Sequence, residues 1–247
     1  MILLMSTTLE RERGGRVARV TYDNSRRGNC FDQALLTELA DVLEEAAADP
    51  ACAVIRLELA GRNFCGGWDT SSFEALAAAG TDAVAADLRT SDESLGRIRR
   101  LPVPVVAAVR GQVIGFGAGL LAAVHLPVAA SDVRLSLPEV RYGFAPAGVG
   151  HTVAQALPRA QAYALLTGTT ATAAQLLAWG LVARVVTETT LDAEVDELVE
   201  SLAAVPGDAL RAVVEVVESS IATGSPAAAY EISARTIVRP PAEGADR

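Results

Sequence analysis

The chain has 247 residues, 51% of them hydrophobic and 21% charged, so it can build a sizeable core and lies far from the composition of disordered chains. This length fits one large domain or one domain with a short appendage. The formal net charge of −9, without a basic run, argues against a nucleic-acid partner. All 21 cationic residues are arginines, and the lack of lysine excludes Schiff-base chemistry, the P-loop nucleotide site and a lysine general base.

The cysteine and histidine contents argue against a disulfide framework and against a metal site. Cys30, Cys52 and Cys65 are odd in number and lack CxxC spacing, while His125 and His151 are the only histidines. The apolar segment 1–5 is too short for the core of a signal peptide, and no later stretch has the ~18 uninterrupted apolar residues of a membrane helix. We therefore expect a soluble, cytoplasmic protein that has no metal and no membrane partner.

Apolar periodicity predicts strands that alternate with helices. In chain order these are a strand at 16–22, a helix at 31–48, a strand at 53–59, a helical Ala-rich region to 94, a strand at 105–109, a helix after 119, and short strands at 126–130 and 133–135. From 151 onward the pattern is mostly helical, with one strand near 181–186, and the last ~40 residues predict two helices and a polar tail. This order predicts an α/β core over 1–190 and a helical region over 191–247.

Two glycine-rich loops are candidates for binding. Gly115-Phe-Gly-Ala-Gly119 suggests a dinucleotide fingerprint, but residues 110–114 separate it from the preceding strand and the third glycine is not at GxGxxG spacing. Glycines before a helix can instead expose backbone N–H groups to a developing negative charge, which makes an oxyanion hole. The comparable loop Cys65-Gly-Gly-Trp-Asp69 is the natural source of a second donor.

Four motifs in one register over about 17–186 resemble the enoyl-CoA hydratase/isomerase, or crotonase, superfamily. They are Arg62-Asn-Phe-Cys-Gly-Gly-Trp-Asp69, similar to F-x-x-G-x-D; Pro104-Val-Val-Ala-Ala-Val-Arg-Gly111; Pro138 to Gly150, similar to P-E-x-x-x-G-x-x-P-x-x-G; and Ala174-x4-Trp-Gly-Leu-Val182. The resemblance implies an α/β spiral of ββα units over 1–190 and a C-terminal helical trimerisation region over 191–247. It also implies a homotrimer or hexamer, with no cofactor beyond the CoA or phosphopantetheine of the substrate.

Carried over by position, the resemblance implies that the backbone N–H groups of Trp68 and Phe116 bind the carbonyl oxygen of an acyl thioester. Both side chains depart from the family pattern, which has glycine at the second position, but the donor is the backbone. The other residues that the resemblance places at the substrate are Gly67, Gly115, Gly117, Tyr142 and His151. Glu139 is the implied catalytic acid and base.

Hydratases of the family use two glutamates, 20 residues apart, and only one of the two is present here. Glu139 matches the second, but position 119, twenty residues earlier, is a glycine. Two carboxylates can split a water across a double bond, whereas one can only move a proton beside the oxyanion hole. Dehydration or double-bond isomerisation is therefore favoured over hydration.

The segment around Tyr142 and the loop at 64–69 look most like enzymes of polyketide β-branching, which act on carrier-bound acyl groups. Decarboxylases of that type rely on a lysine, which this chain lacks. A conventional enoyl-CoA hydratase, a β-branching decarboxylase and a catalytically silent oligomeric scaffold remain the alternatives.

Each candidate also has a structural interpretation. Glu139 could cap a helix turn, His151 could be a hydrogen-bonded structural histidine, and Trp68 could be a hydrophobic wall. We expect Tyr142, Asp69 and Cys65 to be structural, with Asp69 accepting from loop N–H groups and Cys65 filling apolar space. His125, at the end of an apolar helix, is expected to cap that helix.

Overall fold

A computed structural model describes residues 7–146 and 148–238 and contains one large sheet and one small sheet. The large sheet has the order β1-β2-β3-β4-β6-β9, with strands Thr7–Glu12, Val17–Tyr22, Val54–Leu59, Val105–Val109, Leu126–Ala130 and Arg184–Val186. Only β1 is antiparallel to its neighbour. The small sheet has the order β5-β7-β8, with strands Gln112–Ile114, Arg134–Ser136 and Ala171–Thr172. The predicted α/β class is confirmed.

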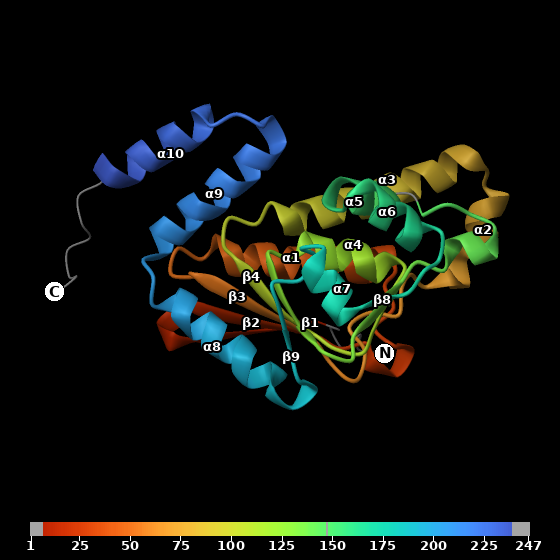
Figure 1. The fold of residues 1–247 in the computed structure, drawn as a ribbon, viewed down its shortest axis with the longest axis horizontal. Coiled ribbons are helices and arrows are strands. Elements are labelled where there is room, and N and C mark those ends of the chain that lie inside the picture. Colours follow the sequence, from red (N-terminus) through yellow and green to blue (C-terminus); the bar gives the residue numbers. More distant parts are fainter. Residues whose placement is uncertain (1–6, 147, 239–247) are drawn as a thin grey trace.

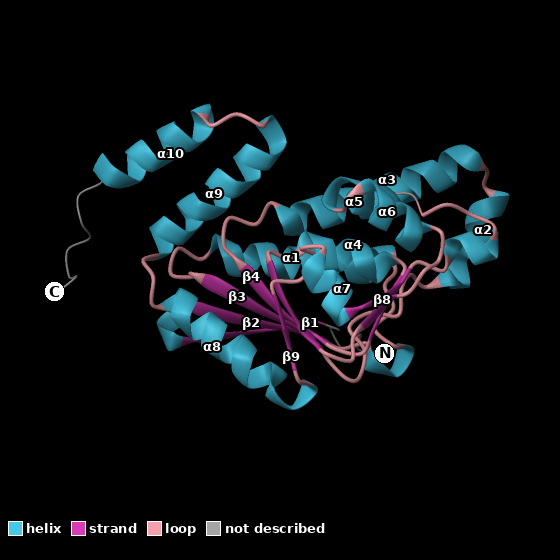
Figure 2. Ribbon diagram, in the orientation of Figure 1, coloured by secondary structure: helices cyan, strands magenta, loops and turns pink. Residues whose placement is uncertain are grey.

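Helices cover the large sheet on both faces (Figure 2). They are α1 (Gln33–Ala48), α2 (Phe73–Ala78), α3 (Thr81–Arg99), α4 (Phe116–Ala123), α5 (Gly148–Ala156), α6 (Arg159–Leu166), α7 (Ala173–Ala178), α8 (Leu191–Ala203), α9 (Gly207–Thr223) and α10 (Ala227–Val238). The first begins where the Asp32 carboxylate accepts from the Leu35 N–H, and it buries an apolar stripe against the sheet. The central strand β4 is buried throughout, as expected for a parallel strand covered on both sides.

Helix α8 packs on the opposite side of the sheet from α1 (Figure 1). Its contact with the sheet includes the buried guanidinium of Arg56 in β3, which is 2% exposed and pairs with Glu58, Asp192 and Asp196 at 2.5, 3.2 and 2.9 Å. Arg110, just after β4, also pairs with Asp192 at 2.7 Å. Thus the first helix after the boundary predicted at 190/191 belongs to the layers around the sheet.

Helices α9 and α10 form a hairpin that extends away from this body (Figure 1). Arg211 anchors its base, since its Nη2 donates to the carbonyl oxygens of Ala47, Asp49 and Cys52 at 3.0–3.2 Å. Further along, the hairpin leaves large apolar side chains in solvent: Val213, Val217, Ile221, Tyr230, Ile237 and Val238 are 47–81% exposed. Such a surface is typical of a segment that another chain covers.

The sequence patterns missed three strands, β1, β5 and the two-residue β8, and overextended a fourth. β1 was not predicted because its residues 10–12 are charged, but at the edge of a sheet charged side chains can stay in solvent. β5 was missed because only three residues of the glycine-rich segment form it. The strand predicted at 181–186 covers only 184–186. The polar tail predicted beyond α10 lies outside the described residues from 239 onward.

The prediction that His125 caps α4 is wrong. Val124 is the C-cap of that helix, and the Nδ1 of His125 accepts the backbone N–H of Val105, at the start of β4, over 3.2 Å. Burial lowers the pKa of His125, and its Nε2 is buried without a hydrogen-bond partner among the described residues. The imidazole is therefore held neutral and joins β4 to the chain that enters β6.

We expect His125 to make the protein less stable in mild acid. Because the pKa of His125 is lower in the folded chain, the unfolded chain binds the proton more readily. The stability that neutral His125 contributes is therefore complete above the unfolded pKa of ~6.5, and it decreases as the pH falls below that value. Thermal unfolding of His125→Gln between pH 8 and 5 should depend less on pH than that of the wild type. The control is His151→Gln, at an exposed histidine; equal pH dependence of all three proteins would contradict the assignment.

Candidate active site

The two glycine-rich loops lie side by side because the first pairs with β5. The Phe64 N–H donates to the Arg110 oxygen at 2.8 Å, the Cys65 N–H to the Gln112 oxygen at 3.1 Å, and the Ile114 N–H to the Cys65 oxygen at 2.9 Å. Residues 64–65 therefore act as a further strand beside β5. The segments that leave this pairing, 66–69 and 115–117, carry the two predicted donors.

The glycines predicted at the substrate shape these two segments. Gly67 and Gly115 have φ of +106° and +52°, a conformation that side chains disfavour. A Cβ at Gly117 would lie 2.8 Å from the Cβ of Cys65, so only glycine permits this approach of the loops. All three glycines thus serve the backbone geometry on which the donors depend.

The backbone N–H groups of Trp68 and Phe116, the two predicted donors, have no acceptor within residues 7–146 and 148–238. Phe116 is the first residue of α4, where an N–H has no acceptor within the helix and the helix dipole favours negative charge. Within 7–146 and 148–238, no hydrogen bond between loops uses the N–H of Trp68 or that of Phe116. The rings of the two residues touch, with centroids 5.0 Å apart. The structure therefore brings together the two residues that the sequence singled out as donors.

Glu139 lies directly against this pair of loops. It follows Pro138 at the start of a short 3-10 turn, Glu139–Tyr142, and a Cβ at Gly115 would be only 2.7 Å from its Oε1. Its Oε2 is buried without a hydrogen-bond partner among the described residues. Burial raises the pKa of Glu139. A carboxyl group with one buried, unpaired oxygen and a raised pKa, next to the N-terminus of α4, is suited to moving a proton.

The surroundings of Gly119 are aliphatic. A Cβ at this position would lie 3.0 Å from Leu95 Cδ1 in α3 and 3.0 Å from Val149 Cγ2 in α5. The place from which a second glutamate would project is therefore filled by two hydrocarbon side chains.

Among the described residues, neither Tyr142 nor His151 forms a hydrogen bond with Glu139. Tyr142 is 77% exposed in the turn that Glu139 begins, and His151 is exposed on α5. Their role in binding substrate stays a prediction.

The structural interpretation of Asp69 fits its contacts, because its carboxylate accepts the Ser71 N–H at 3.0 Å and pairs with Arg27 at 2.7 Å. Cys65 is fully buried, as an apolar filler should be.

Phe31 is a residue near the site that the sequence patterns did not single out. It is fully buried, its N–H donates to the Gly67 oxygen at 3.0 Å, and its oxygen accepts the Asp69 N–H at 2.6 Å. These two bonds hold the peptide of Trp68 between them. The only signal in the sequence was an aromatic residue before a helix, which ordinarily indicates core packing.

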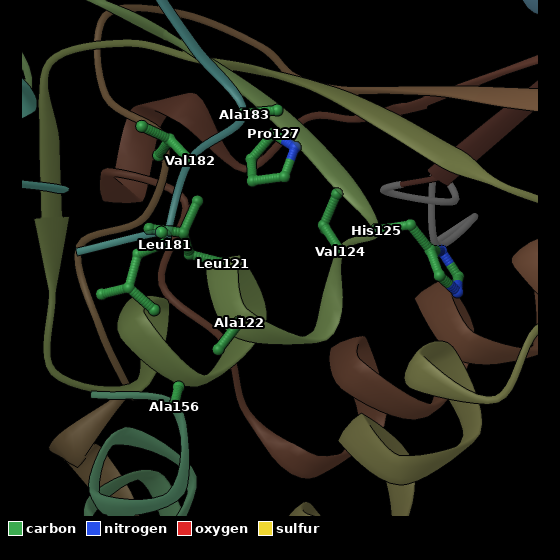
Figure 3. A pocket seen from close by; sticks show the side chains of 10 residues that line it. Leu121, Ala122, Val124, His125, Pro127, Ala156, Leu181, Val182 and Ala183 are labelled. Carbon is green, nitrogen blue, oxygen red and sulfur yellow. The ribbon is translucent and has the colours of Figure 1, made fainter. Parts of the chain in front are cut away.

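A cavity of about 200 Å³ lies away from Glu139, at the C-terminal end of α4 (Figure 3). Leu121, Val124, Pro127, Leu181 and Val182 are among the residues that line it, and Leu121 lies beside Leu181. Gly115, against which Glu139 packs, precedes the first residue of the same helix. The eight residues of α4 span about 12 Å, so the cavity at its C-terminal end is about this far from Gly115 at its N-terminal end. The cavity is therefore separate from the candidate site around Glu139.

Two further searches of the described residues concern metals and membranes. No group of three or more His, Cys, Asp or Glu side chains within 7–146 and 148–238 is arranged to hold a metal ion. None of the helices in this part of the chain has the length and apolarity needed to cross a bilayer.

Known proteins resemble the chain in sequence and in structure. The family model for enoyl-CoA hydratase/isomerase matches residues 12–243. A carnitinyl-CoA dehydratase from Proteus mirabilis is 30% identical over 203 residues, 81% of this chain and 76% of that protein. A probable enoyl-CoA hydratase from Bacillus subtilis is 32% identical over 143 residues, which are 58% of this chain and 53% of the relative, so the chain spans about half the length of that protein.

Among solved structures, Pseudomonas aeruginosa AtuE superposes with a TM-score of 0.85 at 27% identity, over 94% of this chain and 90% of that one. The predicted spiral fold is therefore confirmed by structural neighbours as well as by the family model.

Proposed function

Because the chain belongs to the enoyl-CoA hydratase/isomerase family, we propose that it is an enzyme that moves a proton within an acyl thioester. The N–H groups of Trp68 and Phe116 bind the thioester oxygen and stabilise the enolate. Glu139 takes a proton from carbon and returns it to another position, or passes it to a leaving hydroxide. The observation that carries this proposal is the closeness of the Glu139 carboxyl group, whose Oε2 is buried without a partner among the described residues, to Gly115, next to the Phe116 donor.

Double-bond isomerisation, which needs one proton-transferring carboxylate, fits the site better than hydration. Dehydration fits only where Glu139 itself both takes the proton from carbon and passes it to the leaving hydroxide, and the same site would then catalyse the reverse addition of water. Addition of water calls for a second polar group to hold and deprotonate the water, and the aliphatic surroundings of Gly119 supply none. A conventional hydratase is for this reason the less supported alternative. Decarboxylation in the manner of the lysine-dependent enzymes is disfavoured by the lack of lysine.

The acyl group is carried by CoA or by the phosphopantetheine of a carrier protein, and the enzyme itself needs no further cofactor. A role in polyketide biosynthesis rests on the motif at 142–146 and the loop at 64–69. Cytoplasmic location accords with the three free thiols, two of them buried.

Exchange of solvent deuterium tests the reaction directly. The purified protein is incubated in D₂O with 2-enoyl, 3-enoyl and 3-hydroxyacyl thioesters of CoA and of a carrier protein. The mass of each product is then measured by mass spectrometry. We expect deuterium in the acyl chain together with a moved double bond or lost water. Efficient hydration of crotonyl-CoA, with no movement of a double bond in any probe, would favour a conventional hydratase. Absence of exchange with every thioester would favour a silent scaffold.

The exposed apolar side chains of the α9–α10 hairpin support assembly into a trimer or a dimer of trimers. Light scattering should give three or six times the chain mass of 25.6 kDa. Val217→Asp combined with Ile221→Asp should lower the mass, because it places charges on this surface. Leu88→Asp changes an exposed apolar residue of α3 and is the control. A wild-type monomer at micromolar concentration would contradict the proposal.

A further inference from the structure

Four aromatic rings form a continuous column that ends at the two donor residues. Tyr22 and Phe31 stack with centroids 4.3 Å apart and an interplanar angle of 12°. Phe31 meets Phe116 at 5.5 Å, and Phe116 meets Trp68 edge to face at 5.0 Å. The column is anchored in the sheet, since the fully buried Tyr22 donates its hydroxyl to the Cys30 oxygen at 2.9 Å.

The backbone around the donors needs such an anchor. Trp68 follows Gly66 and Gly67, and Phe116 lies between Gly115 and Gly117. Glycine restricts its backbone less than any other residue, so these segments are weakly held by local sterics. The backbone of Trp68 is held on either side by the two hydrogen bonds of Phe31, and Phe116 begins helix α4. The side chains of Trp68 and Phe116 add a direct contact between the two donor residues.

We propose that the ring contact between Trp68 and Phe116 is a positioning device that sets the separation and direction of the two oxyanion-binding N–H groups. The inference rests on the proposed function, because the N–H groups matter only if they bind a thioester oxygen. Trp68 lies at the solvent end of the column and is partly buried, whereas Phe116 is 7% exposed. Each ring acts through its own backbone, so both side chains are positioning groups and the peptide N–H groups do the binding.

The expected effect follows from the strength of an edge-to-face contact. Such a contact changes an equilibrium by about two- to tenfold beyond the burial of area. We therefore expect Trp68→Leu and Phe116→Leu each to lower kcat by about three- to tenfold, with KM within about twofold of the wild type. The double variant should be little worse than either single variant, because the contact is already lost after one change.

The absorption spectrum of a bound conjugated thioester reports the donors separately from turnover. The probes are the CoA and pantetheine thioesters of 2,4-hexadienoic acid, whose absorption moves to longer wavelength when the carbonyl is polarised. We expect a red shift with the wild type and a smaller one with each leucine variant. Trp68→Phe keeps a ring at this position and should recover most of the shift and of kcat.

Trp179→Leu is the matched control, since Trp179 is the other tryptophan of the chain and is likewise partly buried against the core. It should keep the wild-type shift. A red shift of wild-type size in both leucine variants would overturn this inference and leave the proposed function standing. The same holds if the loss of kcat in the double variant equals the product of the losses in the two single variants. No shift in the wild type with either probe would overturn the proposed function and this inference together. If Trp68→Leu does not fold, Phe116→Leu and Trp68→Phe give the same decision.

Discussion

Replacement of Glu139 by glutamine should lower turnover by a factor of about 10²–10⁴ while the fold and the assembly state stay unchanged. The variant keeps the shape of the side chain and removes its ability to take a proton. No other carboxyl group of the described residues contacts Gly115 in this way, and the surroundings of Gly119 are aliphatic. Turnover is measured with the thioester that exchanges deuterium, and the fold by circular dichroism. Turnover like that of the wild type would remove Glu139 from the mechanism.

The same residue predicts a pH dependence. Burial raises the pKa of Glu139 above its usual value near 4.5. The base must be ionised to accept a proton, so turnover should fall as the pH falls through this raised pKa, and the residual turnover of Glu139→Gln should lack that step.

For stability the sign is opposite. Between the unfolded and the folded pKa of Glu139 the folded chain binds more protons, so stability increases as the pH falls through this window. Glu139→Gln removes the cost of burying a charge, and its Tm at neutral pH should equal or exceed that of the wild type. A lower Tm would mean that the carboxylate is a structural cap.

Gly115→Ala should strongly reduce both stability and turnover. The φ of +52° is unfavourable for alanine, and the new Cβ would lie 2.7 Å from Glu139 Oε1. Backbone strain costs about 1–3 kcal/mol. The collision must also move either the carboxylate or the peptide that precedes the Phe116 donor, and a displacement of ~1 Å at a reacting group can cost about 10²-fold in rate.

Gly224→Ala separates strain from collision. Gly224 has a φ of +62°, close to that of Gly115, but no atom lies within 4 Å of its added Cβ. Both variants should lose stability in thermal unfolding, and only Gly115→Ala should lose turnover with the thioester substrate. Equal turnover of the two variants would mean that the carboxyl group can leave Gly115 without consequence for the reaction.

The sequence by itself determined the α/β class, most of the strands and the residues around which the candidate site is built. These features depend on local patterns. An apolar run such as 105–109 forms a buried strand wherever it lies, a Pro-Glu pair begins a turn, and glycines next to a donor keep the backbone free to approach a ligand. The resemblance to the family then predicted Glu139, Trp68 and Phe116 as members of one candidate site, because each residue has a fixed position within a motif.

Only the tertiary structure decided what surrounds these residues. Leu95 and Val149, which close over Gly119, lie 24 and 30 residues from it in the chain. Phe31, whose ring supports Phe116, lies 85 residues before it. Tertiary structure also decided β1, whose charges are compatible with a strand only at an edge, and His125, whose partner is the first residue of a strand 20 residues earlier. Local periodicity indicates which face of a helix or strand is apolar. Which neighbouring element covers that face depends on the packing of the whole chain.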